Sequence, residues 1–363
     1  MFMIKFLHAA DLHLDSAFRG LTPARAAERR QEQRQMLTDM AELGNRTGCD
    51  LWLLAGDLFD SDNAFPETLE ALSRALGSFR GKVFIAPGNH DCLMAGSPYF
   101  SAKWPDNVHI FTSDSISFVD LPALGCRVYG AGFRTQEAPA LLQGFRVEDR
   151  EPVNLMVLHG DTETPGSPYD PITQEQIAAS GLRYLALGHV HLRTEMRQAG
   201  ETCYAWPGCP MGRGFDELGQ KGVYLGSIDK TGCTLDFYPL PGRRYEILSV
   251  PAGDDPLAAV LAALPADTRE HIYRVLLTGP ADPIDTRALY AALEDRFYEL
   301  DIRDRTEPKA DLWQGMGENT LRGQFLSLMR EKLEQAPPEG RETILQAVQL
   351  GLAAMEGREE AVL

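Results

Sequence analysis

Short apolar runs alternate with helical patterns and polar loops over the first 240 residues. Runs rich in branched and aromatic residues predict strands, and six of them are Ile4–Ala10, Asp50–Ala55, Lys82–Ala86, Val108–Thr112, Val153–Leu158 and Tyr184–Leu187. Helices are predicted over Pro23–Gly44 and Pro66–Leu76, each with Pro at its start, and more short strands over Asn107–Gly132 and Glu201–Tyr238. This order of elements indicates an α/β layered sandwich.

A smaller unit follows the Pro- and Gly-containing stretch Pro239–Arg244, which is typical of a linker. Its pattern predicts a strand, helix, strand, helix and strand at Tyr245–Val250, Asp255–Leu264, His271–Leu277, Asp285–Arg296 and Tyr298–Ile302. Residues 304–318 look irregular, and amphipathic helices are predicted over Asn319–Gln335 and Arg341–Glu356. We therefore expect three parts: residues 1–240, a small α/β unit at 245–303, and C-terminal helices at 319–357. Those helices suit either docking to a partner or closure of a small core of their own.

Composition narrows the class of protein. With 44% apolar residues the chain has enough material for real cores, and six scattered cysteines without a C-x-x-C pair argue against a thiolate zinc site. The first residues form only a short apolar run interrupted by Lys5, and no window approaches the ~20 apolar residues of a membrane span. We therefore expect free thiols in a cytoplasmic protein that does not cross a membrane.

The net charge of −17 is unusual for a protein that holds nucleic acid by its own surface, since such surfaces are basic. Any action on a polyanion would need positive potential that is local, or that comes from metal ions or a partner.

Polar residues collect directly after five of the predicted strands. In open α/β sheets the carboxyl ends of the strands form the edge where ligands bind. Five of the eight histidines lie in these positions, namely His13, His90, His159, His189 and His191. A single one would be explained by ordinary packing, but five beside two Asp-containing turns would not.

These residue types point to a two-metal site. Imidazole and carboxylate ligands suit Mn, Fe, Zn or Ni rather than Ca, and two cations about 3.5–4 Å apart need a bridging ligand. Seven residues fill two coordination spheres: Asp11, His13, Asp57, Asn89, His159, His189 and His191. Two dications against two carboxylates leave a surplus of about +2, which would hold a phosphate and activate a water. The acidic surface is then no obstacle at the site itself.

The same segments resemble the five motifs of calcineurin-like metallophosphoesterases, over about residues 4–240. The motifs here are Asp11-x-His13, Gly56-Asp57-x-x-Asp60, Gly88-Asn89-His90-Asp91, His159 and Gly188-His189-x-His191. The resemblance implies a four-layer αββα sandwich with a small α/β C-terminal capping domain and terminal helices. It also implies that one metal takes Asp11, His13, Asp57 and His191, and that the other takes Asp57, Asn89, His159 and His189. His90 would then protonate the leaving oxygen, and Asp91 would orient His90.

Within this family the chain is most similar to the SbcD-type DNA-repair exonucleases, in particular the YhaO-like branch. The similarity rests on Leu7–Ser16, Trp104–Val108, Trp206–Arg213 and the presence of a C-terminal unit. It implies hydrolysis of DNA phosphodiesters with manganese, in concert with an SMC-like coiled-coil ATPase. A homodimer is a further partner that we keep open.

Two other functions remain open. A phosphodiesterase or phosphatase for a small molecule would use the same metal centre, although the C-terminal unit favours the nuclease. A scaffold protein without catalysis is disfavoured, because every motif position holds a competent residue type. Four arginines flank the motif loops and are candidate DNA contacts, with a solvated or structural role as the favoured alternative: Arg19, Arg134, Arg193 and Arg213. Phe18 and Tyr99 could stack on a base, but ordinary packing is the favoured explanation.

Overall fold

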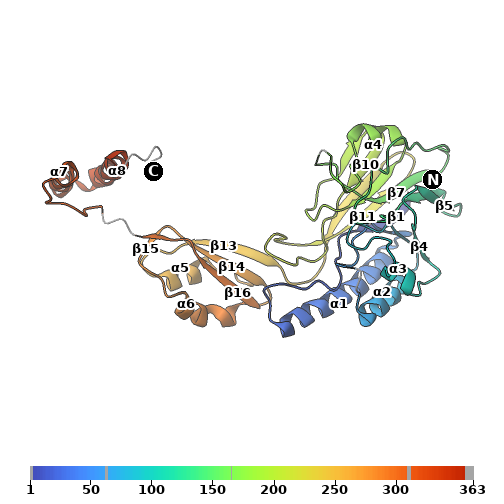
Figure 1. Cartoon of the computed structure of the whole chain (residues 1–363), viewed down its shortest axis with the longest axis horizontal. Helices are drawn as coiled ribbons and strands as arrows, with labels where there is room; N and C mark the ends of the chain where they lie inside the picture. The colour runs from blue at the N-terminus through green and yellow to red at the C-terminus, as the bar shows by residue number, and fades with distance from the viewer. Residues whose placement is uncertain (1–2, 62–63, 165, 309–311, 356–363) are drawn as a thin grey trace. The chain divides into compact units, whose positions relative to one another are not determined.

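The computed structural model describes residues 3–61, 64–164, 166–308 and 312–355. The chain divides into two compact units. Figure 1 shows its helices and strands with their labels. The first contains Met1–Leu248, Pro265–Val275 and Leu293–Asp301, and the second contains Ser249–Leu264, Leu276–Ala292 and Ile302–Leu363. The division into residues 1–240, 245–303 and 319–357 stays a prediction, and residues 356–357 of the last part lie outside the described residues.

Two six-stranded sheets form the first unit. In spatial order the first sheet consists of β12 (Cys233–Pro239), β11 (Gly222–Ile228), β1 (Ile4–Ala9), β2 (Leu51–Leu54), β3 (Lys82–Ile85) and β4 (Val108–Ile110). The second consists of β5 (Ser117–Leu121), β6 (Cys126–Gly130), β7 (Val153–His159), β8 (Tyr184–Gly188), β10 (Thr202–Ala205) and β9 (Arg197–Ala199). The central strands β1–β4 run parallel, as do β6, β7, β8 and β10. The strands β2, β7 and β8 are buried along their whole length, which explains why their sequences are largely apolar.

The inner faces of the two sheets pack against each other. Phe6, Leu53 and Phe84 of the first sheet share one core cluster with Leu155 and Tyr184 of the second. Apolar burial between the two sheets is the main driving force for this packing, because each large side chain removed from water contributes roughly 1.5–3 kcal/mol. The sandwich thereby fixes the carboxyl ends of strands from both sheets at one edge.

Helices cover the outer faces. On the first sheet, Met40 of α1 (Pro23–Thr47) and Leu72 of α2 (Pro66–Ser78) pack with Trp52 in one core cluster. On the second sheet, Ile177 of α4 (Gln174–Ser180) packs with Leu185. A short helix, α3, spans Pro98–Ser101. The layers run helix, sheet, sheet, helix, so the expected α/β sandwich is confirmed.

The C-terminal part of the chain contains a three-stranded sheet in the order β13 (Tyr245–Pro251), β14 (Ile272–Thr278) and β16 (Glu299–Asp304). Its helices are α5 (Pro256–Ala263), α6 (Thr286–Leu293) and the 3-10 helix Glu294–Arg296. The segment expected to be irregular contributes a two-residue strand, β17 (Glu307–Pro308), which pairs in parallel with β15 (Pro280–Ala281). Such a short pairing leaves no periodic pattern in the sequence.

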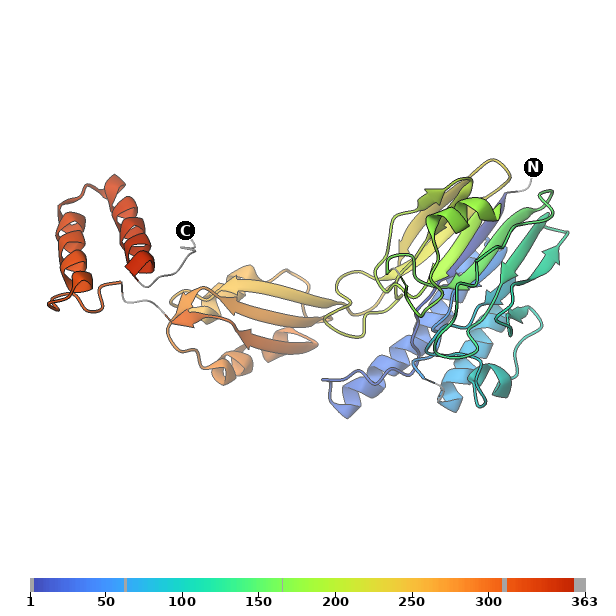
Figure 2. The same cartoon turned by 45° about the horizontal axis from the view of Figure 1, so that its top comes forward.

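The last two helices, α7 (Leu321–Gln335) and α8 (Pro338–Met355), lie side by side (Figure 2). Leu326 of α7 packs against Val348 and Leu352 of α8 in a small cluster. Part of each apolar face therefore closes a core between the two helices. Leu321 and Leu328 of α7 remain exposed, with 75% and 54% of their surface accessible, so the docking hypothesis for these helices stays a prediction.

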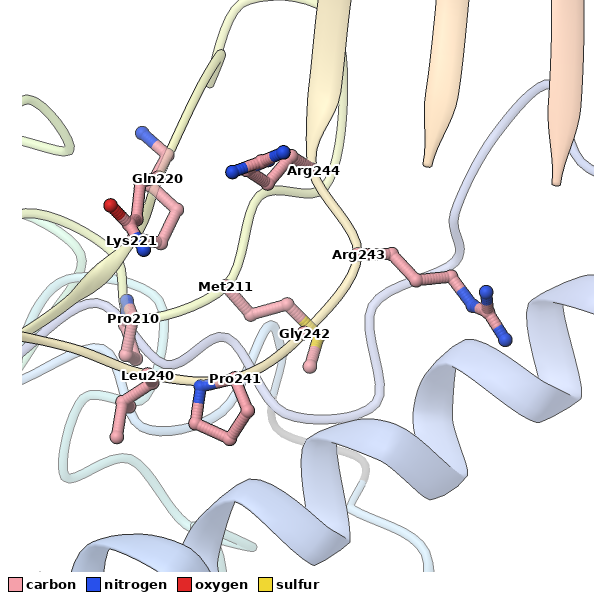
Figure 3. Close-up of a pocket in the computed structure, with 9 residues that line it drawn as sticks. All are labelled: Pro210, Met211, Gln220, Lys221, Leu240, Pro241, Gly242, Arg243 and Arg244. Atoms are coloured by element: carbon pink, nitrogen blue, oxygen red, sulfur yellow. The ribbon is translucent and has the colours of Figure 1, made fainter. Parts of the chain in front are cut away.

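The linker after β12 carries two adjacent arginines that turn in different directions. In Figure 3 the side chain of Arg243 points toward α1, and its Nε lies 2.8 Å from Oε1 of Glu32. Nη2 of Arg244 lies 2.8 Å from Nε2 of His271. Arg243, Arg244 and Met211 are among the residues that border a cavity of about 120 Å³. The linker arginines therefore serve contacts within the chain.

Within the described residues, no helix combines the length and the apolar character that crossing a bilayer requires. The expectation of a cytoplasmic location stays a prediction.

Candidate metal centre

The seven expected ligands lie at the carboxyl ends of five strands, drawn from both sheets. They follow or end β1, β2, β3, β7 and β8 and are Asp11, His13, Asp57, Asn89, His159, His189 and His191. One ligand atom from each of four residues lies within 4.8 Å of the others, in Asp11, His13, Asp57 and His191. In the remaining group, Oδ1 of Asn89 lies 2.9 Å from Nε2 of His159 and 3.4 Å from Nδ1 of His189. The structure therefore gathers all seven in two groups.

Asp57 joins the two groups. Its Oδ2 lies 3.7 Å from Nε2 of His13 and 3.5 Å from Nε2 of His159. Its Oδ1 accepts the backbone N–H of His90 at 2.9 Å, which fixes the orientation of the carboxylate. Oδ2 is thus held between one histidine of each group, the position that a bridging ligand requires.

The oxygen and nitrogen atoms of these side chains are placed to bind cations rather than to form hydrogen bonds with one another. Oδ1 of Asp11 accepts the backbone N–H of His189, but its buried Oδ2 has no hydrogen-bond partner. Nδ1 of His159 donates to the Ala55 carbonyl at 2.9 Å, which leaves the Nε2 lone pair facing oxygen atoms of Asn89 and Asp57. Lone pairs that face one another in a buried site repel unless a cation lies between them. The residues present therefore fit divalent metal ions.

The backbone at the ligands adopts unusual conformations. Positive φ angles are uncommon outside glycine, because Cβ crowds the backbone, yet φ is 55° at Asp11, 43° at His13, 51° at Asp57 and 98° at His189. Each such residue costs roughly 1–3 kcal/mol, and residues of this kind cluster at functional sites. A Cβ on Gly88 would lie 2.3 Å from Oδ1 of Asp57, so this glycine is required for the close approach of its loop.

Two acidic residues outside the seven lie beside the histidines of the first group, and one of them, Glu217, forms a hydrogen bond. Oδ1 of Asp60 lies 3.2 Å from Nδ1 of His13, and Oε1 of Glu217 lies 2.8 Å from Nδ1 of His191. When Nδ1–H points to a carboxylate, the Nε2 lone pair is free for a metal. The two Nε2 atoms lie 3.1 Å apart, as two ligands of one ion would.

Arg213 connects these two acids. Its guanidinium lies 3.0 Å from Oδ1 of Asp60 and 2.6 Å from Oε1 of Glu217. Burial alone would raise the pKa of Glu217, but the hydrogen bonds from His191 and Arg213 outweigh burial and hold that pKa well below its ordinary value. Glu217 is therefore an anion that both the imidazole and the guanidinium stabilise. Its position was not evident in the sequence, whereas Asp60 lies in the motif that contains Asp57.

Residues 4–193 match the sequence profile of the family described as Calcineurin-like phosphoesterase. The chain belongs to this family. The expected family resemblance is thereby confirmed, and it assigns a metal-dependent hydrolase. Together with the two groups of ligands, it indicates a dimetal site.

Several known proteins are similar in sequence to this phosphoesterase. "Uncharacterized metallophosphoesterase YhaO" of Bacillus subtilis (strain 168) is 32% identical over 260 residues, which cover 68% of this chain and 61% of that protein. "DNA double-strand break repair protein Mre11" of Methanopyrus kandleri is 23% identical, over 90% of this chain and 78% of that one. A component of the nuclease SbcCD from Rhodobacter capsulatus is 25% identical, over 80% and 84% respectively. The match thus spans about three fifths of the length of the Bacillus protein.

His90 lies beside the ligands of the phosphoesterase site but is open to solvent. Its ring meets the ring of His13 edge-on, with 4.8 Å between the centroids. Its Nδ1 lies 3.2 Å from the carbonyl oxygen of Asp60. With Nδ1–H donated to that carbonyl, Nε2 faces outward. This position suits a histidine that exchanges a proton with a substrate.

Asp91 is buried and binds the backbone of two loops beside the site. Its carboxylate accepts backbone N–H groups of Leu58 at 2.7 Å and Gly88 at 2.7 Å, and the hydroxyl of Tyr99 donates to it at 2.6 Å. In the described part of the chain these contacts hold the loops after β2 and β3 together, and none of them reaches the ring of His90. The expectation that Asp91 orients His90 stays a prediction. Asp91 acts on the site through the two loops.

The remaining candidates for substrate contact divide into two groups. Phe18 and Tyr99 are 3% and 4% exposed, so base stacking is wrong for both and the packing alternative is confirmed. Arg19, Arg134 and Arg193 are exposed, and their role as DNA contacts stays a prediction. Arg213, a further candidate, is held by the two carboxylates described above, which favours the structural alternative.

Proposed function

We propose that this phosphoesterase is a two-metal DNA nuclease of the SbcD type that acts in DNA repair together with an SMC-like coiled-coil ATPase. The observation that carries the hydrolytic part is the pair of ligand groups that share Asp57, with the unpartnered Oδ2 of Asp11 buried beside them.

Bound metal ions would supply Lewis-acid stabilisation of the phosphate and activation of a water. We infer Mn²⁺, because the donors are a mixture of imidazole, carboxylate and amide groups; Fe, Zn and Ni are alternatives. Asp60 and Glu217 add negative charge near the site and Arg213 removes part of it, so two dications leave a surplus of about +1. A phosphodiester carries about one negative charge, which this surplus positive charge would balance.

His90 has the position of the general acid. Its ring is fixed through Nδ1 by the Asp60 carbonyl, and its backbone N–H is fixed by Asp57. In the protonated imidazole, Nε2–H would be available to the oxygen that leaves phosphorus. Such proton transfer typically contributes 10²–10⁴-fold to the rate.

Support for DNA as the substrate comes from the length of the matches. The family profile ends at residue 193, but the Mre11 and SbcCD relatives match 90% and 80% of this chain. Their similarity thus continues into the C-terminal part, which a hydrolase of small esters would not need. The alternative is a phosphodiesterase or phosphatase that acts on a small molecule with the same metal centre.

The charge of the chain supports a partner. At −17 the protein lacks the basic surface that binds DNA unaided. A partner that contributes positive potential would remove this difficulty, and the exposed Leu321 and Leu328 on α7 offer an apolar contact for a coiled coil. Self-association into a homodimer would use the same kind of surface.

The test compares end-labelled linear duplex DNA with bis(p-nitrophenyl) phosphate, each with Mn²⁺ and with the ATPase encoded nearest to this gene. The nuclease proposal predicts DNA cleavage that is lost in Asp57→Asn and retained in His109→Ala, because His109 lies outside the site. Hydrolysis of the small ester without DNA cleavage at any partner ratio would instead establish the small-molecule alternative. Loss of both activities in a protein that binds no metal would identify a scaffold protein.

A further inference from the structure

Two of the six cysteines meet between the sheets of the first unit. Cys203 lies on β10 of the second sheet and belongs to the core cluster between the sheets, and Cys233, the first residue of β12 in the first sheet, packs against the same cluster. The two thiols are close enough for each to shift the pKa of the other. Both residues also border one surface pocket of about 310 Å³, so a small molecule in solvent can approach the pair.

We propose that Cys203 and Cys233 are a modification site: a hydroperoxide oxidises them to a disulfide that links the two sheets. The Cys203 thiolate attacks one peroxide oxygen, so an S–O bond forms, the O–O bond breaks, and water or an alcohol leaves. The Cys233 thiol then attacks the sulfenic sulfur, an S–S bond forms, and the thiol proton leaves with the hydroxide as water. The two thiols lose two electrons, which the peroxide accepts.

The surroundings activate one of the two sulfurs. The hydrogen bond from Cys233 lowers the pKa of Cys203 to about 7, with burial acting in the opposite direction and the Arg183 guanidinium acting in the same one. A thiolate with a pKa near the ambient pH is the best nucleophile of its class. By contrast, burial raises the pKa of Cys126 and of Cys209 to about 12. Those two thiols are expected to be inert.

The disulfide would link the two ends of a segment that contributes side chains to the candidate metal centre. The loop closed between Cys203 and Cys233 includes β11 and also Arg213 and Glu217, which contact His191. A disulfide restricts the unfolded state in proportion to the logarithm of the loop length. For a unit of this size, a loop of about 30 residues corresponds to a rise in unfolding temperature of about 5–10 °C.

The experiment uses the full chain, treated with hydrogen peroxide, blocked with N-ethylmaleimide and digested without reduction. Mass spectrometry is expected to find residues 198–213 joined to residues 231–243. Fragment ions must assign the link to Cys203, because Cys209 lies in the same peptide. Dithiothreitol should remove the link together with the rise in unfolding temperature.

Two variants and a control complete the test. Cys233→Ser should leave Cys203 as a sulfenic acid that dimedone traps, and its unfolding temperature should not rise with peroxide. Cys203→Ser should lose the link and leave Cys233 unmodified, whereas Cys126→Ser should behave as wild type. A link that involves other cysteines, or oxidation of Cys203 to sulfinic acid without any link in the wild-type chain, would overturn the proposal. The wild-type digest remains decisive even if a variant fails to fold.

Discussion

Replacing Glu217 by Gln should weaken one of the two metal positions and spare the other. The carboxylate accepts from Nδ1 of His191 at 2.8 Å and from the backbone N–H of Arg213 at 2.8 Å, and only 4% of the residue is exposed. Gln keeps the shape of Glu but removes the negative charge. The Nδ1–H of His191 then loses a charged acceptor, and its Nε2 becomes a weaker donor to a metal.

The size of the effect follows from the contacts. Loss of a hydrogen-bonding partner behind a histidine ligand typically lowers metal affinity 10–100-fold, or about 1.4–2.7 kcal/mol. Arg213 keeps its ion pair with Asp60 at 3.0 Å and remains 18% exposed at its side chain, so the cost to folding should be only about 1–3 kcal/mol. The His159 and His189 group has no contact with Glu217 among the described hydrogen bonds and ion pairs, so its affinity should be unchanged.

The assay is calorimetric titration of Mn²⁺ into chelator-stripped protein, with urea unfolding as a separate measure of stability. The matched control is Glu151→Gln, which removes an exposed ion pair with Lys230 (3.3 Å) that contributes little. Wild-type affinity at both positions in a folded Glu217→Gln protein would refute the reasoning. So would an equal loss at both positions.

Three further predictions concern single residues. His90→Ala should keep both metal ions and reduce kcat about 10²–10⁴-fold; loss of metal would assign His90 to the ligands. Burial lowers the pKa of His8 to about 3, so the folded state disfavours its proton, and stability should be full above pH 6.5 and fall as the pH drops toward 3. Urea unfolding at pH 7.5 and pH 5 should show a loss about 2 kcal/mol larger in wild type than in His8→Gln, and equal losses would contradict this. A Cβ on Gly188 would lie 1.8 Å from the Ala55 carbonyl oxygen. Gly188→Ala should therefore lower the free energy of unfolding by more than about 3 kcal/mol in the same urea assay. The control Gly232→Ala should leave it unchanged, because a Cβ there would meet no atom within 4 Å.

The sequence was enough to expect these side chains at one edge of the sheets, because each belongs to a short motif at the end of an apolar run. The direction of the strand then decides at which edge of the sheet the residue lies. Both the strand and the residue can be recognised from a short stretch of sequence. Asp11 and His191 are far apart in the chain but meet because β1 and β8 end at the same edge. No long-range knowledge was needed to expect them together.

The supporting contacts could not be predicted in the same way. Glu217 lies in an irregular loop, 26 residues from the histidine that it holds, and a lone Glu in a loop carries no pattern. The contacts of Asp91 with backbone N–H groups depend on the packing of two loops. The helix α4 was missed although a readable signal existed, since Thr173 and Gln176 form a capping box at its start.

The most direct test of the two-metal centre is the number of Mn²⁺ ions bound per chain, measured by elemental analysis after equilibrium dialysis. Because Asp57 lies between both groups of ligands, two ions are expected in the wild-type chain and neither at full occupancy in folded Asp57→Asn. A single ion in wild type, or two ions retained in Asp57→Asn, would contradict a shared dimetal site.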